Sequence, residues 1–426
     1  MMELKRYRLG DIAEIYNGAT PSTADSTNYD GDIIWATPKD LSEQQSKWFY
    51  KGDRNITKKG LDSCSAKMIP ANNILMSSRA PIGLCSINKV DCCTNQGFKS
   101  IVLDKSIADV DFMYYFLKYH IKEIEALGSG TTFKEISKTS FEKYEINIPN
   151  LTTQKKIASI LSCFDEKIAL NRVLNQNLEA MAKQLYDYWF VQFDFPDKNG
   201  RPYKSSGGEM VWNEKLKREI PKGWISTTIN EVCTSCRGVS YGKDDLLPNG
   251  NGILVLRGNN IENNHIVYDS NVAFVPYDFI NEEQRIKEGD IVMTMSSGSK
   301  AHVGKCAMFY KDSKHTFGAF LSKFTPKKEM RYMIFLFLTS EYFKSLITAF
   351  CNGTGINNLT NQTFDDVILV LPNEKTLQQF ESKVKPLFGM IGNNEENIEV
   401  LTKQRDELLP LLMNGQVSVN SDLSAD

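Results

Sequence analysis

The sequence predicts an α+β protein in which two similar domains alternate with two long helices that pair as an antiparallel coiled coil, giving a pseudo-twofold internal repeat. Three observations predict this class. A stripe of large residues at helical spacing occurs twice, the same order of short strands and polar loops precedes each stripe, and a turn-rich connector separates the copies. At 426 residues, the chain is long enough for two or three domains with cores of their own. The predicted divisions are a first domain at 1–150, a first long helix at 151–191, a connector at 192–218, a second domain at 219–372, a second long helix at 373–413 and a flexible tail at 414–426.

Each long helix is predicted from residues that recur at alternating steps of four and three, the seam pattern of a helix that packs against another helix. Asn394 lies 223 positions after Asn171, so both seams carry an asparagine at the same level of the repeat. We expect a buried polar pair there, which fixes the register at some cost in stability. Two unrelated amphipathic helices are the alternative. The predicted seam residues are Leu161, Phe164, Ile168, Asn171, Leu178 and Leu185 on the first helix and Leu387, Ile391, Asn394, Leu401 and Leu408 on the second.

The two domains repeat one another as well. Short strands, Ser-rich loops and a helix recur in the same order, at 33–35, 77–79 and 111–127 in the first domain and at 253–255, 296–300 and 330–350 in the second. The asparagine that follows the last strand of each domain, Asn150 or Asn373, can cap the long helix. Pro386 lies inside the second helix, where proline removes a hydrogen bond at a cost of about 3 kcal/mol, so we expect a kink or break near Lys385.

The composition excludes several classes of function. A net charge of −2 excludes a polycation that coats nucleic acid regardless of sequence. The N-terminus lacks the apolar core of a signal peptide and no apolar run could span a bilayer, so we expect a cytoplasmic protein without membrane contact. The four histidines and the lone pair Cys233 and Cys236 lack metal-ligand spacing, and no catalytic constellation is found. We therefore expect a protein that is not an enzyme and holds no metal.

Side chains that suit the reading of DNA bases lie on the predicted loops. Arginine can form two hydrogen bonds with guanine, and asparagine or glutamine two with adenine, in the major groove. A basic run with interleaved aromatic residues at 47–59 could follow a phosphate backbone, and a solvated face is its alternative. The candidate DNA-binding residues are Ser77, Ser78, Arg79, Gln96, Arg257, Asn259, Asn260, Ser296, Ser297 and Lys300.

The pattern as a whole resembles one family, the specificity subunits of type I DNA restriction-modification systems. The resemblance covers essentially the whole chain. It is carried by the segments 76–83, 95–98 and 189–194 leading to 220–224, and by the endings of the two domains, from Gly130-Thr131 to Pro149 and from Gly353-Thr354 to Pro372. The second helix departs from the family pattern at 376–379 and at Pro386, which puts its geometry in question.

The resemblance implies two target-recognition domains, each of which reads one half of a split sequence in double-stranded DNA. It also implies that the helices set the spacer and dock two modification subunits. The chain itself would need no cofactor, because those partners bind S-adenosylmethionine and methylate adenine; restriction subunits can join them. About 40 helical residues span roughly 60 Å, more than one turn of B-DNA. A fused restriction-methylation enzyme and a two-domain scaffold are the alternatives.

Overall fold

The computed structural model describes residues 2–44, 46–79, 81–130, 134–248, 250–268, 272–351 and 358–417. The chain divides into two compact units: unit 1 comprises residues 1–170 and 397–426, and unit 2 comprises residues 171–396. Each long helix therefore contributes one part to each unit. Thr131, Gly353 and Thr354, which carry part of the family resemblance, lie outside the described residues, as does most of the predicted tail.

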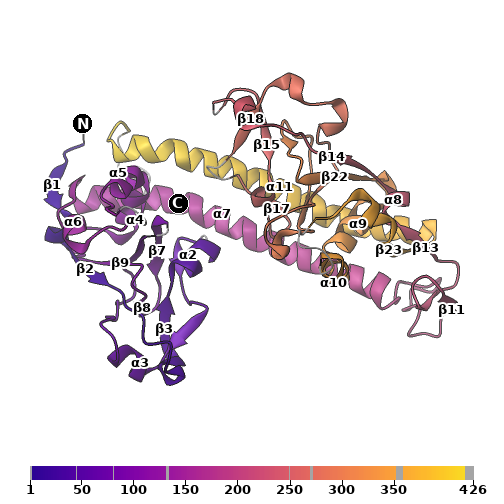
Figure 1. The fold of residues 1–426 in the computed structure, drawn as a ribbon, viewed down its shortest axis with the longest axis horizontal. Coiled ribbons are helices and arrows are strands. Elements are labelled where there is room, and N and C mark those ends of the chain that lie inside the picture. Colours follow the sequence, from indigo (N-terminus) through magenta and orange to yellow (C-terminus); the bar gives the residue numbers. More distant parts are fainter. Residues whose placement is uncertain are drawn as a thin grey trace. The chain divides into compact units, whose positions relative to one another are not determined.

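Unit 1 is built around a five-stranded sheet in the order β2-β9-β6-β7-β4 and a three-stranded sheet in the order β5-β3-β8, and β1 pairs with β10 (Figure 1). The helix predicted at 111–127 is two helices, α4 and α5, that meet at His120. The elements of unit 1 are β1 (Lys5–Arg8), α1 (Leu9–Ile12), β2 (Ala13–Asn17), η1 (Ser26–Asn28), β3 (Tyr29–Ala36), α2 (Pro38–Gln44), β4 (Trp48–Phe49), β5 (Arg54–Ile56), α3 (Lys58–Asp62), β6 (Ile74–Ser78), β7 (Ile82–Asn88), β8 (Cys93–Thr94), β9 (Lys99–Leu103), α4 (Val110–Tyr119), α5 (Ile121–Ala126), α6 (Lys138–Glu142), β10 (Glu145–Ile148) and the first part of α7 (Leu151–Tyr186).

Unit 2 contains a four-stranded sheet in the order β14-β22-β19-β20 and a three-stranded sheet in the order β18-β15-β21. Its elements, after α7, are η2 (Asp187–Val191), β11 (Met210–Asn213), β12 (Arg218–Pro221), β13 (Ile225–Thr228), α8 (Ile229–Val232), β14 (Cys233–Arg237), η3 (Lys243–Asp245), β15 (Ile253–Leu256), η4 (Gly258–Asn260), β16 (Ile261–Glu262), β17 (His265–Ile266), β18 (Ala273–Val275), η5 (Tyr277–Phe279), η6 (Glu282–Gln284), β19 (Ile291–Thr294), η7 (Lys300–His302), β20 (Cys306–Met308), β21 (Thr316–Phe317), β22 (Leu321–Pro326), η8 (Lys328–Met330), α9 (Arg331–Leu338), α10 (Glu341–Cys351), η9 (Asn361–Asp365), β23 (Ile368–Leu371) and α11 (Glu374–Met413), which ends in unit 1.

The two units share one plan, which confirms the predicted internal repeat. The order β2-β9-β6-β7 in unit 1 matches β14-β22-β19-β20 in unit 2. In each unit a further sheet holds one parallel pair, β3 with β8 and β15 with β21. The strand that ends beside the long helix pairs antiparallel with a strand near the start of its domain, β10 with β1 and β23 with β13. The α+β class is therefore confirmed.

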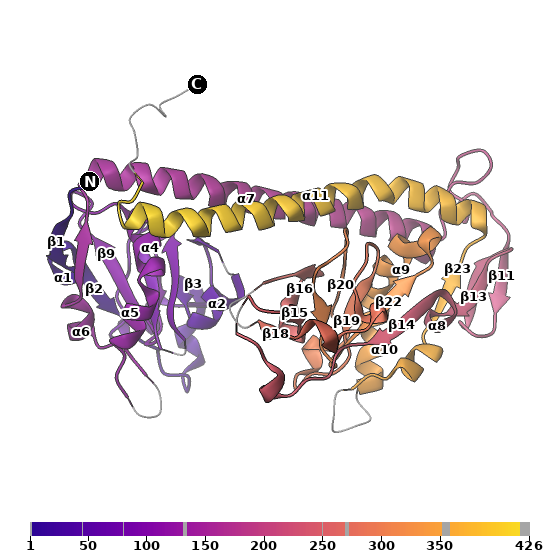
Figure 2. The same ribbon diagram turned by 90° about the horizontal axis from the view of Figure 1, so that it is seen from above.

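Helices α7 and α11 run antiparallel inside each unit, as Figure 2 shows. In unit 1 the end of α11 reaches the core, where Leu412 and Met413 join Ile157 and Leu161. In unit 2 the rings of Phe190 and Phe380 lie 4.7 Å apart, edge to face. The coiled coil is therefore confirmed. Leu161, Ile168, Leu178 and Ile391 of the predicted seam are buried, and Phe164, Asn171, Leu185, Leu387, Asn394, Leu401 and Leu408 are half-buried.

The seam contains the predicted polar pair, but the partner of Asn394 is Asn175 and not the predicted Asn171. Asn394 donates through Nδ2 to Oδ1 of Asn175 at 2.8 Å, and Asn175 is buried. Asn171, one turn earlier, is not its partner. In an antiparallel pair, residue numbers rise along one helix while they fall along the other. Residues at equal positions in the repeat therefore need not face one another.

No break occurs near Lys385, because α11 runs without interruption from Glu374 to Met413. The break is therefore the part of that expectation that is wrong. Val384 and Phe388 are buried on either side of Pro386, whose own ring is exposed. Burial of this face offsets the lost hydrogen bond, since each large apolar side chain contributes roughly 2 kcal/mol when buried.

The predicted caps of the long helices are confirmed. Asn150 Oδ1 accepts from the Thr153 N–H at 2.9 Å, and Asn373 Oδ1 accepts from the Thr376 N–H at 3.0 Å. Within the described ranges, no single helix is long and apolar enough to cross a membrane. The bent pair at 328–338 and 341–351, with an angle of 65°, meets that test only when its halves are taken together.

Candidate nucleic-acid interface

In each unit, one turn joins the ends of three strands. In unit 1 this turn comprises residues 94–98, which we call junction 1. The Asn95 N–H donates to the carbonyl of Ala36 at the end of β3 (3.0 Å), and the Ser78 N–H at the end of β6 donates to the carbonyl of Gly97 (2.7 Å). The Ala19 N–H, just after β2, donates to the carbonyl of Thr94 (2.9 Å). Loops that are far apart in sequence therefore meet at one place.

Unit 2 repeats this arrangement at residues 317–321, which we call junction 2. The Gly318 N–H donates to the carbonyl of Leu256 at the end of β15 (2.9 Å), and the Met295 N–H donates to that of Phe320 (2.9 Å). The Val239 N–H donates to the carbonyl of Phe317 (2.8 Å). The same three bonds hold both junctions, so Phe320 occupies in unit 2 the backbone position that Gly97 occupies in unit 1.

Two predicted base readers lie at junction 1. Arg79 follows β6 and is half-buried, with its guanidinium 3.6 Å from the carboxylate of Glu135. Glu135 also pairs with Lys99 at 3.2 Å, and the Lys99 ammonium is buried. Gln96 is exposed, and its carbonyl oxygen accepts from the hydroxyl of Thr20. The strand residue Lys99 thus holds Glu135, and Glu135 positions Arg79.

The predicted readers of unit 2 lie on the loops that follow β15 and β19. Arg257 follows β15 and donates through Nε to the hydroxyl of Tyr241 at 2.9 Å. Ser296 is half-buried, and its N–H donates to the carbonyl of Phe320 at 3.3 Å. The hydroxyl of Ser297 accepts from the N–H of Ser299 at 3.3 Å. Asn259 and Lys300 are exposed on the same loops.

Three of the predicted readers use their side chains inside the protein. The Ser77 hydroxyl donates to the carbonyl of Pro81 (2.6 Å), and the Ser78 hydroxyl accepts from Lys99. Asn260 is fully buried: its Oδ1 accepts from the Arg257 N–H, and its amide donates to a backbone carbonyl. These side chains are buried and shape the loops from inside the protein. The sequence could not distinguish them, because the type of a polar residue says nothing about its burial.

The basic run at 47–59 does not form one cationic face. The ammonium of Lys47 is buried, 2.6 Å from Asp111. Arg54 lies over the ring of Tyr29, at 4.2 Å from its centroid. Two further lysines of the run form ion pairs: Lys58 pairs with Asp62 at 2.9 Å, and Lys59 pairs with Asp25 at 2.8 Å.

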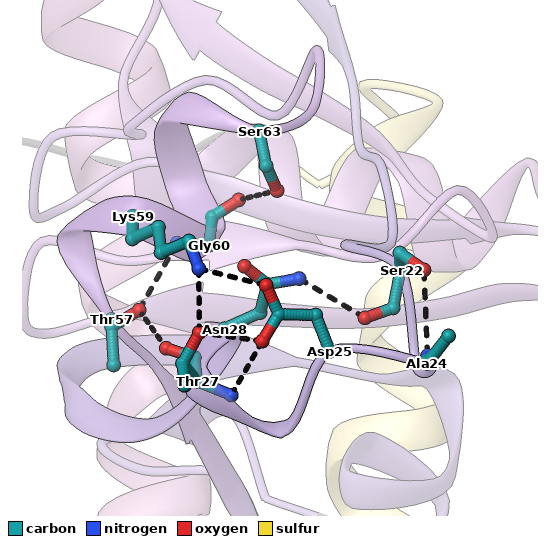
Figure 3. A network of polar contacts seen from close by, with 9 residues as sticks. All are labelled: Ser22, Ala24, Asp25, Thr27, Asn28, Thr57, Lys59, Gly60 and Ser63. Carbon is teal, nitrogen blue, oxygen red and sulfur yellow. Dashed lines mark hydrogen bonds and ion pairs between the residues drawn. The ribbon is translucent and has the colours of Figure 1, made fainter.

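A polar network around Lys59 fixes the loop that precedes β3 (Figure 3). Asp25 accepts from the Lys59 ammonium, and this hydrogen bond is the largest of the effects that lower the pKa of Asp25 to about 2. Thr57 donates to the carbonyl of Thr27 at 2.8 Å, and its hydroxyl caps α3 by accepting from Gly60 N–H. Lys59 therefore anchors a loop, which leaves it less suited to a phosphate.

Polar groups that sequence reasoning missed fasten each unit to its part of the long helices. In unit 1 the Lys47 ammonium donates to the hydroxyl of Ser162 on α7 at 2.7 Å. In unit 2 the ring of His265 lies between Glu179 on α7, at 2.7 Å, and Glu395 on α11. Burial alone would lower the pKa of His265, but the hydrogen bonds to both carboxylates outweigh it and raise the pKa to about 10.

A second pair of contacts joins the long helices to α4 in unit 1 and to α9 in unit 2. Gln154 on α7 accepts from the N–H of Asp109, the N-cap of α4, at 2.8 Å, and its amide donates to the carbonyls of Ile107 and Pro149. Glu381 on α11 accepts from the Met333 N–H in the first turn of α9, also at 2.8 Å. Burial raises the pKa of Glu381 to about 7.

Among the described residues, no group of three or more His, Cys, Asp or Glu side chains could hold a metal ion. All nine cysteines are free thiols. The loops at the two junctions present hydrogen-bond donors and acceptors, as a binding surface requires.

Two similar units with equivalent loop junctions, joined by shared helices, define a class of two-domain recognition protein. The family model of the type I restriction modification DNA specificity domain matches residues 1–180 and 221–403, so the chain belongs to this family of non-catalytic DNA-recognition subunits. The resemblance seen in the sequence is thereby confirmed. The chain binds DNA and works within a type I restriction-modification complex.

Individual relatives agree with this assignment. The chain is 32% identical to the specificity subunit of the type I restriction enzyme MjaIX from Methanocaldococcus jannaschii, over 97% of this chain and 93% of that one. It is 29% identical to the StySPI specificity subunit from Salmonella potsdam, over 47% of this chain and 44% of that one. The crystal structure of a type I restriction-modification S subunit from M. genitalium matches with a TM-score of 0.53 at 17% identity over 96% of each chain, which supports the fold.

Proposed function

We propose that each unit of this specificity subunit reads one half of a two-part target in double-stranded DNA through its junction. The observation that carries the proposal is the convergence of three loops at equivalent places in two units of one plan. The backbone of the two junctions is alike, while the side chains on them differ. Two different half-sites are the expected result, because side chains that contact base edges specify sequence.

At junction 1 the proposed readers are Arg79 and Gln96. Arg79 is held by Glu135 through one guanidinium nitrogen, and its other N–H groups can donate to guanine. The exposed Gln96 suits adenine. At junction 2 the proposed readers are Arg257, Asn259 and Lys300, with Ser296 and Ser297 on the neighbouring loop.

The long helices supply the second part of the proposal, the docking of two modification subunits and the setting of the spacer. Helix α7 exposes the apolar side chains of Val173, Leu174 and Met181, and α11 exposes Met390. Exposed apolar residues on a helix suit a protein partner. Changing Leu174 to Glu should prevent assembly with the modification subunit, and native mass spectrometry of the wild-type complex should give two such subunits per chain. A single modification subunit would contradict the stoichiometry.

Exchange of one domain tests the reading of half-sites. The chain and its modification subunit are expressed together, and methylated positions are mapped by methylome sequencing in cells with and without the chain. Replacement of residues 1–150 by the same region of a relative should change only one half of the methylated sequence, and replacement of 219–372 should change only the other. A change in both halves after either exchange would refute the proposal.

Substitution of Arg79 tests the junction itself. Arg79→Ala should weaken binding by about 1–3 kcal/mol and relax one position of one half-site. Lys138→Ala is the matched control, because Lys138 pairs with Glu142 on α6 and is not at the junction. Equal behaviour of the two variants in a DNA-binding titration would remove Arg79 from the interface.

A further inference from the structure

Phe320 at junction 2 has no counterpart in unit 1. Its backbone position corresponds to Gly97, because the carbonyl of each residue accepts the N–H at the end of the equivalent strand. Gly97 is buried, whereas 69% of the Phe320 surface is exposed. Unit 2 therefore presents a large apolar ring at a place where unit 1 presents no side chain.

The turn that carries Phe320 is held firmly. Its carbonyl accepts from two N–H groups, those of Met295 at 2.9 Å and Ser296 at 3.3 Å. The Leu321 N–H donates to the carbonyl of Gly318 at 2.8 Å and closes the turn. An apolar ring on such a turn can make a contact without the cost of ordering its backbone, which favours binding.

Two arginines lie around the turn that carries the ring. Arg237 donates through Nε to the carbonyl of Ala319, the neighbour of Phe320, at 3.3 Å. The ring of Tyr241 lies beside Gly318 and accepts the Nε–H of Arg257 at its hydroxyl. An apolar protein partner would leave these guanidinium groups without a counter-charge, whereas a nucleic acid supplies phosphates around its bases.

The exposed Trp212 lacks this setting. Trp212 in the β11–β12 hairpin is 57% exposed, but its indole N–H donates to Glu214, an acidic neighbour. Single exposed apolar residues of that kind are common on protein surfaces. Rigid backbone, exposure and cationic neighbours occur together at Phe320.

We propose that Phe320 is a specificity-determining residue that contacts the methyl group of a thymine in the major groove of the half-site read by unit 2. Thymine is the only base whose major-groove edge carries a methyl group, and phenylalanine can contact it. The inference rests on the proposed DNA-reading function of the junctions and assigns the base and the contact at one of them.

The test uses the full complex with its modification subunit and an unmethylated duplex that contains the target sequence identified by methylome sequencing. Each thymine in the half-site of unit 2 is replaced in turn by deoxyuridine, which removes only the methyl group. One replacement should weaken binding of the wild-type complex roughly three- to tenfold, the scale for one buried methyl group. Phe320→Ala should bind the normal duplex with a loss of similar size and show no further loss on that replacement. Trp212→Ala is the control and should keep wild-type behaviour.

Each contrary outcome has a separate meaning. Specific binding that is unaffected by every deoxyuridine, a half-site without thymine, or a Phe320→Ala complex that remains sensitive to the replacement would overturn the thymine contact and leave the proposed function intact. Loss of subunit assembly by Phe320→Ala, measured by size-exclusion chromatography, would overturn it in favour of a protein contact. A wild-type complex with no sequence preference at all would refute the proposed function itself.

Discussion

Units 1 and 2 share their strand order but differ in the groups that attach them to the long helices. In unit 1 the cation Lys47 is buried among Asp111, Ser162 and aromatic rings, and the helix contact is a hydroxyl. In unit 2 the cation is His265, and the helix contacts are two carboxylates. The attachment to the helices thus differs between the units in position and in charge, although the strand order is the same.

The contact with α4 or α9 also differs. Gln154 makes it in unit 1 without charge, and Glu381 makes it in unit 2 with a carboxyl group whose pKa is about 7. Unit 2 therefore contains two ionisable attachments with shifted pKa values, while Gln154 does not titrate. Through these contacts, the stability of unit 2 should depend on pH near neutrality more strongly than the stability of unit 1 does.

The largest effect should come from giving unit 1 the chemistry of unit 2. Gln154→Glu removes the amide that donates to two carbonyls and places a carboxylate against them, which should cost about 4 kcal/mol or more at pH 7.5. Gln154→Met, which loses the hydrogen bonds without adding charge, should cost about half as much. Urea denaturation with hydrogen exchange at α4 measures both, and equal losses would show that charge is irrelevant there.

His265→Gln should cost roughly 3 kcal/mol at pH 6. The folded pKa of His265, about 10, exceeds the unfolded value, so its contribution is complete below pH 6.5 and is lost as pH rises through 10. The difference from wild type should therefore shrink over that window, as followed by hydrogen exchange in β16 and β17. His302→Gln on the exposed η7 is the control. A loss that stays constant up to pH 10.5 would contradict the charged bridge.

Lys47→Met should cost unit 1 about 2 kcal/mol, because Asp111 loses its partner but is itself partly exposed. Methionine keeps most of the packing of the lysine stem. Lys51→Met, at an exposed position of the same segment, should change stability by less than about 0.5 kcal/mol. If both variants unfold at the same urea concentration, Lys47 does not fasten the unit to α7.

The smallest effect should be a gain. Glu381→Gln gives unit 2 the neutral contact of unit 1. Because the folded pKa of Glu381 is raised to about 7, its stabilising contribution is complete below pH 4.5 and is lost as pH rises through 7. The variant should match wild type at pH 4.5 and exceed it by about 1–2 kcal/mol at pH 8. Glu396→Gln, at an exposed position of the same helix, should show no such gain.

Local patterns in the sequence were enough to predict the helices, their caps and the repeat. The spacing of Leu161, Ile168 and Leu178 indicates a helical seam, and Asn150 or Asn373 after the last strand indicates a cap, because these signals lie within a few residues of the element they describe. The break expected at Pro386 was wrong for the opposite reason. The local cost of proline does not end the helix, because Val384 and Phe388 on either side of it are buried.

The site was predicted less completely, because its geometry depends on contacts between distant segments. The segments that carry Arg79 and Gln96 meet at junction 1 through backbone bonds that no motif encodes. Asn260 was predicted as a reader from its residue type, and its burial could only come from the fold. Phe320 was missed because an isolated phenylalanine between strands suggests core, not surface.

Unit 1 is discontinuous, since residues 1–170 and 397–426 together form it and the whole of unit 2 is translated between them. Its core includes Leu412 and Met413, among the last residues of α11. During synthesis, residues 1–170 emerge before the part of α11 that completes their core, whereas all of unit 2 is made before residue 397, so unit 2 can finish folding earlier. A premature stop after residue 396 would damage the beginning of the protein more than its middle.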